Sequence, residues 1–266
     1  MFYGINSSED QAIFDDCLGK LAQIFVPLYA SDDLITMRRN VGFLEDEKLI
    51  TAVEKALPFI KSAALREQAR SKLWRLHTLT WAASSVLNVP GDYVECGAFD
   101  GFSAAVVANY VDLRQRFKSY YIYDTFCGLS DKYATDEELK KNRFFEQHLE
   151  VYEVCTARFK DYENVKIVKG VLPDILAETA PEKVSLLHID LNCAQAELGT
   201  LEFFFDRVST GGFILLDDYG KIVFRAQKDV ADTFMRERDH SVLELPTGQG
   251  LVLKRQGNYR VMDSRR

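Results

Sequence analysis

The chain has 266 residues, of which 47% are hydrophobic and 27% are charged, and it carries a net charge of −7. That hydrophobic fraction is large enough to build a packed core, so a chain that is disordered along most of its length is excluded. Because an acidic surface repels phosphates, we expect no nucleic acid partner. The apolar runs are all shorter than the ~18 residues of a membrane-spanning helix, so we expect no membrane span.

The five cysteines indicate the compartment in which the protein works. Their number is odd and no Cys-x-x-Cys pair occurs among them, at Cys17, Cys96, Cys127, Cys155 and Cys193. This pattern supports neither a disulfide framework nor a zinc site. We therefore expect reduced thiols and a cytoplasmic location.

The first 88 residues are predicted to form a helical region. Between residues 45 and 69, apolar side chains recur at helical spacing, at Leu49, Val53, Ala56 and Ile60. Pro58 should kink or split this helix, because proline cannot donate a backbone hydrogen bond. A further helix over 70–87 should end before the turn at Pro90 and Gly91. We place a domain boundary after residue 88 and expect the helical region to act as a lid on the domain formed by residues 89–266.

From residue 89 onward, short apolar runs alternate with helical stretches. The expected strands lie at 93–95, 120–123, 165–168, 184–189 and 212–216, and the expected helices at 102–117, 136–159, 172–178 and 196–208. Such an alternation is typical of a parallel sheet that helices cover on both faces. The runs 242–245 and 251–254 flank a turn that contains Pro246 and two glycines, so they predict a closing antiparallel hairpin. The predicted fold class is therefore α/β, with a doubly wound sheet of seven strands.

A glycine turn follows the first expected strand. Gly97 and Gly101 stand four residues apart there, which lets a ligand approach the backbone where a helix begins. Glu95 closes this strand and suits a cationic group, while Asp124 closes the second strand, where a carboxylate accepts hydrogen bonds from ribose hydroxyls. These features indicate a site for S-adenosylmethionine. A helix-capping turn or another nucleotide are the alternatives, although the glycine spacing does not match the dinucleotide-binding pattern.

Three further carboxylates are predicted to meet at the same sheet edge. Asp190 ends the fourth expected strand, and Asp217 and Asp218 end the fifth. Like charges so close together repel one another unless they are protonated or share a cation, and their hard oxygen atoms suit Mg²⁺. The alternative is that Asp217 and Asp218 merely begin a loop. His188 shares a strand face with Asp190, and we expect it to have an orienting or structural role rather than that of a base.

Several segments together resemble the macrocin-type (TylF-like) O-methyltransferases, a family of class I S-adenosylmethionine enzymes. The matching segments are 90–97, 124–129, 169–174, 187–190, 211–220 and 246–250, and the likeness extends over roughly residues 70–255. The joint occurrence of Asp-Thr-Phe-Cys-Gly-Leu and Asp-Asp-Tyr-Gly makes the resemblance specific. It implies a Rossmann-like sheet with a helical N-terminal lid.

The resemblance also implies a chemistry and a set of site residues. The expected reaction is Mg²⁺-dependent methyl transfer from S-adenosylmethionine to a hydroxyl of a sugar or glycosylated natural product, so the partner is a small-molecule or glycan acceptor. Homo-oligomers are expected, as is common in the family. The metal ligands would be Asp190, Asp217 and Asp218. The cofactor site would comprise Glu95, Gly97, Ala98, Gly101, Ser103, Asp124, Thr125, Gly170, Val171 and Asp190.

One position departs from the family pattern. Asn192 stands where these enzymes often have an aspartate that is proposed as the general base, and an amide cannot take a proton at neutral pH. Either a metal lowers the pKa of the hydroxyl enough for water or another group to serve, or the acceptor is not a plain alcohol. The catalytic candidates are Asp190, Asn192 and His188. A metal-independent or a non-catalytic S-adenosylmethionine-binding protein of the same fold is the alternative.

Overall fold

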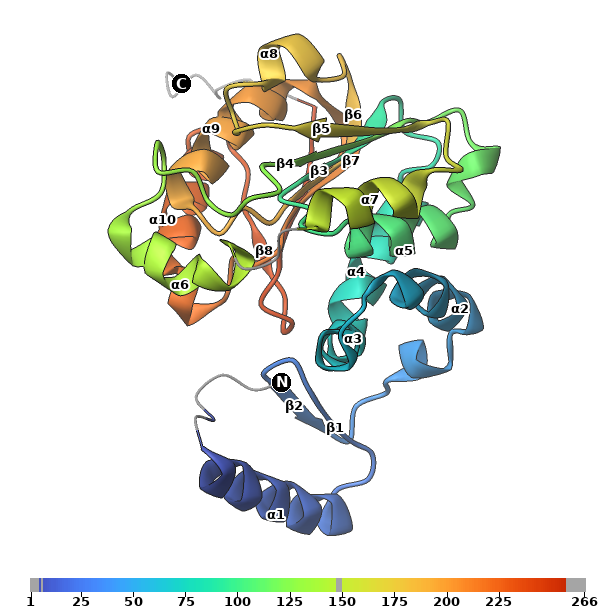
Figure 1. Cartoon of the computed structure of the whole chain (residues 1–266), viewed down its shortest axis with the longest axis vertical. Coiled ribbons are helices and arrows are strands. Elements are labelled where there is room, and N and C mark those ends of the chain that lie inside the picture. Colours follow the sequence, from blue (N-terminus) through green and yellow to red (C-terminus); the bar gives the residue numbers. More distant parts are fainter. Residues whose placement is uncertain (1–4, 6, 147–149, 257–266) are drawn as a thin grey trace, which may run out of the picture.

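A mixed sheet of seven strands forms the centre of the computed structural model, which describes residues 5, 7–146 and 150–256 (Figure 1). Its strand order is β5-β4-β3-β6-β7-β9-β8. Strands β3 to β7, the first five of this sheet in chain order, pair in parallel, and β9 pairs antiparallel with both β7 and β8. The strands are β3 (Asp92–Cys96), β4 (Tyr120–Asp124), β5 (Val165–Lys169), β6 (Val184–Ile189), β7 (Val208–Leu216), β8 (Leu243–Glu244) and β9 (Gly250–Leu253). The predicted doubly wound sheet with a closing antiparallel hairpin is confirmed.

Burial on both faces explains why these segments are strands. All six residues of β6 are buried, as expected for a central strand of a sheet that helices cover on both sides. Alternate side chains of the sheet enter two separate hydrophobic clusters. Tyr93 and Leu186 belong to one cluster, and Val94 and Leu187 belong to the other.

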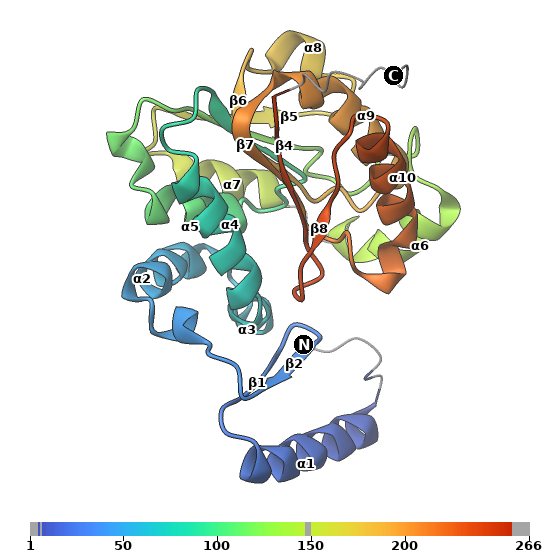
Figure 2. The ribbon, with the colours of Figure 1, turned by 180° about the vertical axis from the view of Figure 1, so that it is seen from behind.

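Helices lie on both faces of the sheet (Figure 2). The cluster around Tyr93 is covered by α2 (Glu47–Ala56), α4 (Leu73–Ser85), α5 (Phe102–Tyr110) and α7 (Val151–Phe159). The opposite cluster is covered by α8 (Leu176–Thr179), α9 (Ala194–Phe204) and α10 (Arg225–Arg236). In the described part of the chain, no helix is both long and apolar enough to cross a membrane.

Helix ends differ from the sequence-based expectation at several points. The helix expected over 45–69 is split at Pro58, as predicted, into α2, a 3₁₀ turn (Leu57–Phe59) and α3 (Ala63–Ser71). The helix expected over 136–159 is instead two helices, α6 (Asp136–Glu146) and α7, and residues 147–149 between them lie outside the described residues. Helix α10 was not predicted, although its few apolar residues recur at helical spacing and only one side of it is buried, as is usual for a surface helix.

The N-terminal region is not purely helical. Between α1 (Ser8–Ile24) and α2 lies an antiparallel hairpin of β1 (Leu28–Ser31) and β2 (Leu34–Met37), which the sequence analysis did not predict. Its two turn residues, Asp32 and Asp33, have φ of 49° and 62°. Turns of this kind usually carry Asn-Gly or Asp-Gly, so Asp-Asp hides the hairpin from pattern analysis. The domain boundary after residue 88 and the lid role stay predictions.

A buried polar pair joins two helices on one face of the sheet. The side chain of Gln227 on α10 donates a hydrogen bond of 2.7 Å from Nε2 to Oε2 of Glu197 on α9. The remaining oxygens, Oε1 of both residues, are buried and have no hydrogen-bond partner among the described residues. Burial raises the pKa of Glu197 to about 8, although the bond from Gln227 opposes this shift. Glu197 is therefore protonated in the folded chain at neutral pH.

This raised pKa predicts a pH-dependent stability. Between the ordinary value of 4.5 and about 8, the folded chain holds a proton on Glu197 that the unfolded chain releases, so the free energy of unfolding falls as pH rises through this range. The whole effect is on the order of 3–5 kcal/mol. Glu197→Gln, which stays neutral, should raise the melting temperature at pH 8.5 by several degrees and change it little at pH 5. Differential scanning calorimetry at both pH values measures this, with the exposed Glu202→Gln on the same helix as the control. Equal shifts at both pH values would contradict the assignment.

Candidate active site

A cavity of about 520 Å³ opens at the carboxyl ends of the central strands, where ligands bind in open α/β sheets. Most of the site residues predicted from the sequence line it. They are Gly97, Ala98, Ser103, Asp124, Thr125, Gly170, Val171, His188, Asp190, Asn192, Asp217 and Asp218. Glu95 and Gly101 are not among its lining residues. The N-terminal region contributes to the wall as well, through Asp32, Lys72 and Arg75.

The two glycines of the turn after β3 have different roles. Gly97 has φ of 87°, and a Cβ atom there would lie 1.9 Å from the main-chain oxygen of Asp190. Only glycine therefore lets the turn after β3 approach the turn after β6 so closely. Gly101 has φ of 76°, and a Cβ atom there would lie 2.8 Å from Sγ of Cys155 on α7. Gly101 thus serves helix packing and does not face the cavity.

Glu95 lies behind the glycine turn and is fully buried. Its Oε1 accepts a hydrogen bond of 2.7 Å from the hydroxyl of Ser103, and its Oε2 accepts one of 2.8 Å from the hydroxyl of Tyr120. Both carboxylate oxygens are thus engaged by neighbouring side chains. The expectation that Glu95 would meet a cationic ligand is not matched by its position, because these contacts direct the side chain into the protein.

Asp124 at the end of β4 is held by backbone amides. Its Oδ2 accepts a hydrogen bond of 2.7 Å from the amide of Phe99, and its Oδ1 accepts one of 2.6 Å from the amide of Phe126. Both of these phenylalanines have positive φ, of 50° and 53°. Burial raises the pKa of Asp124, and the two amide hydrogen bonds oppose the rise. The carboxyl group is therefore fixed in orientation at the wall of the cavity.

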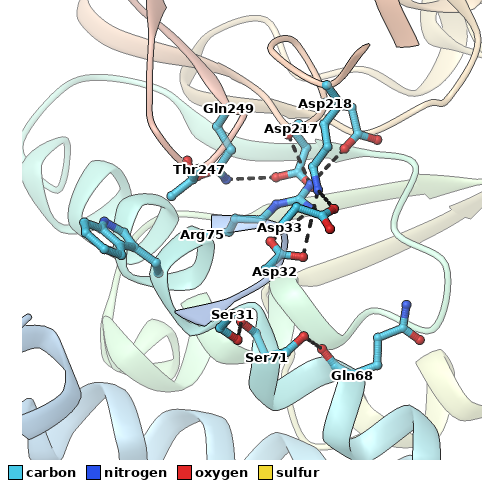
Figure 3. Close-up of polar contacts among 12 residues, drawn as sticks. Ser31, Asp32, Asp33, Gln68, Ser71, Arg75, Asp217, Asp218, Thr247 and Gln249 are labelled. Atoms are coloured by element: carbon cyan, nitrogen blue, oxygen red, sulfur yellow. Dashed lines mark hydrogen bonds and ion pairs between the residues drawn. The ribbon is translucent and has the colours of Figure 1, made fainter. Parts of the chain in front are cut away.

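An ion cluster occupies the other side of the sheet edge (Figure 3). The Arg75 guanidinium on α4 donates through Nη2 to Oδ2 of Asp217, and the distance from Nη2 to Oδ1 of Asp218 is 3.1 Å. Its Nη1 lies 3.6 Å from Oδ2 of Asp32, in the turn between β1 and β2. The amide of Gln249 donates a bond of 2.8 Å to Oδ1 of Asp217. Arg75, Asp217 and Asp218 are all less than 10% exposed, so these charges interact with little screening by water.

The cluster sets the charge of its members. Burial alone would lower the pKa of Arg75, but the surrounding aspartates, Asp217 first, raise it, so the guanidinium stays charged. Burial alone would raise the pKa of Asp217, but the positive charges of Arg75 and His188 hold it well below its usual range. Burial and the neighbouring carboxylates raise the pKa of Asp190. Asp217 is thus the ionised partner of Arg75.

His188 lies between the two halves of the site. Its Nδ1 is 3.5 Å from Oε2 of Glu95, and its Nε2 is 3.5 Å from Oδ1 of Asp217. Burial would lower the pKa of His188, but Asp217 and Glu95 raise it to about 10. The ring is therefore protonated at neutral pH and cannot act as a base. This agrees with an orienting role.

The three carboxylates predicted as Mg²⁺ ligands do meet at one edge, yet their arrangement does not fit the ion. The guanidinium of Arg75 lies against Asp217 and Asp218, where a shared cation would have to lie. In residues 5, 7–146 and 150–256, no group of three or more His, Cys, Asp or Glu side chains has the geometry of a metal site. The sequence analysis missed Arg75. The available signal was that Arg75 is the only Asp, Glu, Lys or Arg residue within α4.

Comparisons with known proteins agree with this architecture. The model of the macrocin-O-methyltransferase (TylF) family matches residues 69–242, more than half of the chain. An 8-demethyl-8-(2,3-dimethoxy-α-L-rhamnosyl)-tetracenomycin-C 4′-O-methyltransferase of Streptomyces olivaceus is 28% identical over 161 residues, which cover 55% of this chain and 60% of that protein. A demethyldecarbamoylnovobiocin O-methyltransferase of Streptomyces niveus is 26% identical over 179 residues, which cover 59% of this chain and 68% of that protein. The match thus spans less than two thirds of the first relative.

A solved structure supports the same fold. The O-methyltransferase NovP superposes with a TM-score of 0.59 and 21% identity, over 69% of this chain and 81% of that one. The family resemblance inferred from the sequence motifs is confirmed by the family match, and the sheet by this superposition. The chain belongs to the macrocin-O-methyltransferase family.

Proposed function

We propose that this protein transfers a methyl group from S-adenosylmethionine to a hydroxyl group of a sugar or glycosylated natural product. Its family and the named activities of its relatives support the reaction class. The observation that carries the proposal is that one cavity is lined both by the glycine turn with Asp124 and by Asp190, which follows β6. A donor and an acceptor can therefore meet in it.

The residues on the β3–β4 side of the cavity fit the donor. Gly97 and Ala98 line this side of the cavity, and two backbone amides orient the carboxyl of Asp124 at its wall, where a carboxylate can accept a hydrogen bond from a ribose hydroxyl. Thr125, Gly170 and Val171 would surround the adenine. S-adenosylmethionine supplies, when bound, a methyl group made electrophilic by its sulfonium charge. Because Glu95 and Gly101 do not line the cavity, we propose that they shape the turn instead.

We assign to Asp190 the role of the general base that takes the proton from the acceptor hydroxyl. It lines the cavity, and none of the described residues donates a hydrogen bond to its carboxylate. Burial, and after it the neighbouring carboxylates, raises the pKa of Asp190, which suits a general base. Asn192 beside it has φ of 53° and lines the same wall, where its amide can hold the acceptor but cannot take its proton. We derive no step through Mg²⁺, because Arg75 lies among the expected ligands.

Replacing Asp124 by alanine should weaken binding of S-adenosylhomocysteine by at least about tenfold, since one charge-assisted hydrogen bond contributes roughly 1.5–3 kcal/mol. Isothermal titration calorimetry measures the loss. Asp131→Ala, an exposed aspartate outside the cavity, is the control and should bind as the wild type does. Circular dichroism establishes that Asp124→Ala is folded. Failure of the wild-type protein to bind S-adenosylhomocysteine would reject the methyltransferase proposal itself.

Replacing Asp190 by asparagine should lower kcat by about 10²–10⁴-fold, the usual contribution of a general base. Affinity for S-adenosylhomocysteine should change by less than about threefold, because the proposed base acts on the acceptor. Mass spectrometry of methylated products from a panel of rhamnosides and aminocoumarin glycosides measures turnover. A wild-type protein that binds the donor yet methylates no member of a broad glycoside panel would favour the non-catalytic alternative.

Two expectations from the sequence stay part of the proposal. We propose that the chain assembles as a homo-oligomer and works in the cytoplasm. Sedimentation equilibrium tests the first of these and fractionation of the source cells tests the second.

A further inference from the structure

Arg75 reaches the acidic cluster from a distant part of the chain. Helix α4 carries it to the ends of β7, where Nη2 contacts Asp217 and Asp218 as well as the main-chain oxygen of Asp217, at 3.1 Å. Asp32 approaches Nη1 from the β1–β2 turn. The guanidinium is therefore held at the point where three carboxylates converge (Figure 3).

The oxygens of Asp217 are engaged by other groups as well. Oδ1 accepts the amide of Gln249, and that amide is oriented in turn by Thr247, whose hydroxyl donates a bond of 3.0 Å to Oε1 of Gln249. Oδ2 is engaged by Arg75. Mg²⁺ requires carboxylate lone pairs at about 2.0–2.1 Å in octahedral geometry. Both oxygens of Asp217 thus already accept a hydrogen bond, and a Mg²⁺ ion that used their remaining lone pairs would have to lie beside the Arg75 guanidinium.

Displacing Arg75 is costly. The side chain is 7% exposed, and removing one partner from a buried ion pair is strongly destabilising, because a charge is left without compensation. A cation that entered the cluster would have to expel the guanidinium or lie beside it, where the two positive charges repel. The fixed guanidinium already offsets the repulsion among the carboxylates, as a shared metal cation would.

We infer that Arg75 takes the place of the divalent cation in this chain, so that methyl transfer here needs no bound metal. Arg75 is a positioning residue: it holds Asp217 and Asp218 at the cavity wall and ties the β1–β2 turn to the same wall through Asp32. The statement that methyl transfer needs no metal rests on the proposed function, whereas the statement that Arg75 occupies the cation position does not. The occupancy of the cation position can be measured without any turnover.

The test uses Mn²⁺ as a probe of the carboxylates in the full chain, followed by electron paramagnetic resonance. Wild-type protein should leave the signal of free Mn²⁺ unchanged at concentrations at which Arg75→Ala binds one equivalent, with affinity at least about tenfold higher than in the wild type. Arg70→Ala removes an exposed arginine of α3 and should behave as the wild type does. Combining Arg75→Ala with Asp218→Asn should abolish the new binding. Arg75→Gln, of similar length and neutral, replaces Arg75→Ala if the smaller side chain prevents folding.

Two results would overturn the inference. The first is stoichiometric binding of Mn²⁺ by the wild-type protein that the Asp218→Asn substitution abolishes. The second is an absence of new Mn²⁺ binding in both Arg75 variants when circular dichroism shows that they are folded. Turnover of the wild type in EDTA should equal that in Mg²⁺, and a loss of turnover that Mg²⁺ restores would likewise reject the inference. Calorimetry of the wild-type protein with S-adenosylhomocysteine separates these outcomes from failure of the proposed function, because Arg75 is not among the residues that we assign to the donor.

Discussion

The buried ion pair between Arg75 and Asp217 joins the parts of this molecule that must cooperate. Asp217 belongs to the end of β7, Arg75 to α4, and Asp32 on the other flank of the guanidinium to the β1–β2 turn. A buried guanidinium among carboxylates is tolerated only when its partners are held in place. Gln249 and His188 hold the other side of Asp217. The wall of the cavity and the N-terminal region are consequently coupled through Arg75, and Lys221 adds contacts of 3.9 Å to Asp32 and 3.4 Å to Asp33.

The opposite side of the cavity is organised by backbone rather than by charge. Gly97 allows the turns after β3 and β6 to touch, and the amides of Phe99 and Phe126 fix Asp124. Such an arrangement is preorganised, since little side-chain freedom is left to lose when a ligand binds. The cavity thus has one half that is organised by backbone and a charged half that is bounded by the N-terminal region, and we propose that these halves bind the donor and the acceptor, respectively.

Much of the sheet was predictable from the sequence because its strands are buried on both faces. Four of the six residues that form β6 are apolar, and the Gly and Pro residues that follow Val242 mark the closing hairpin. Two elements, the β1–β2 hairpin and α10, were not predicted from the sequence. The β1–β2 turn has Asp-Asp at positions that usually carry glycine, so the hairpin lacks the usual turn signal. Helix α10 has few apolar residues, but they recur at helical spacing, so its signal was present in the sequence and was overlooked.

By itself, the sequence determined the fold class, the family, and the meeting of Asp190, Asp217 and Asp218 at one edge, because strand order and strand ends are encoded in local runs and motifs. Only the tertiary structure decided what those carboxylates hold. Arg75 lies 142 residues before Asp217, and no periodicity or motif links positions so far apart. The same holds for Glu95, whose acidic character suggested a ligand contact until its neighbours Ser103 and Tyr120 were known. The partner of a buried charge is a property of packing, and packing is set by the whole chain.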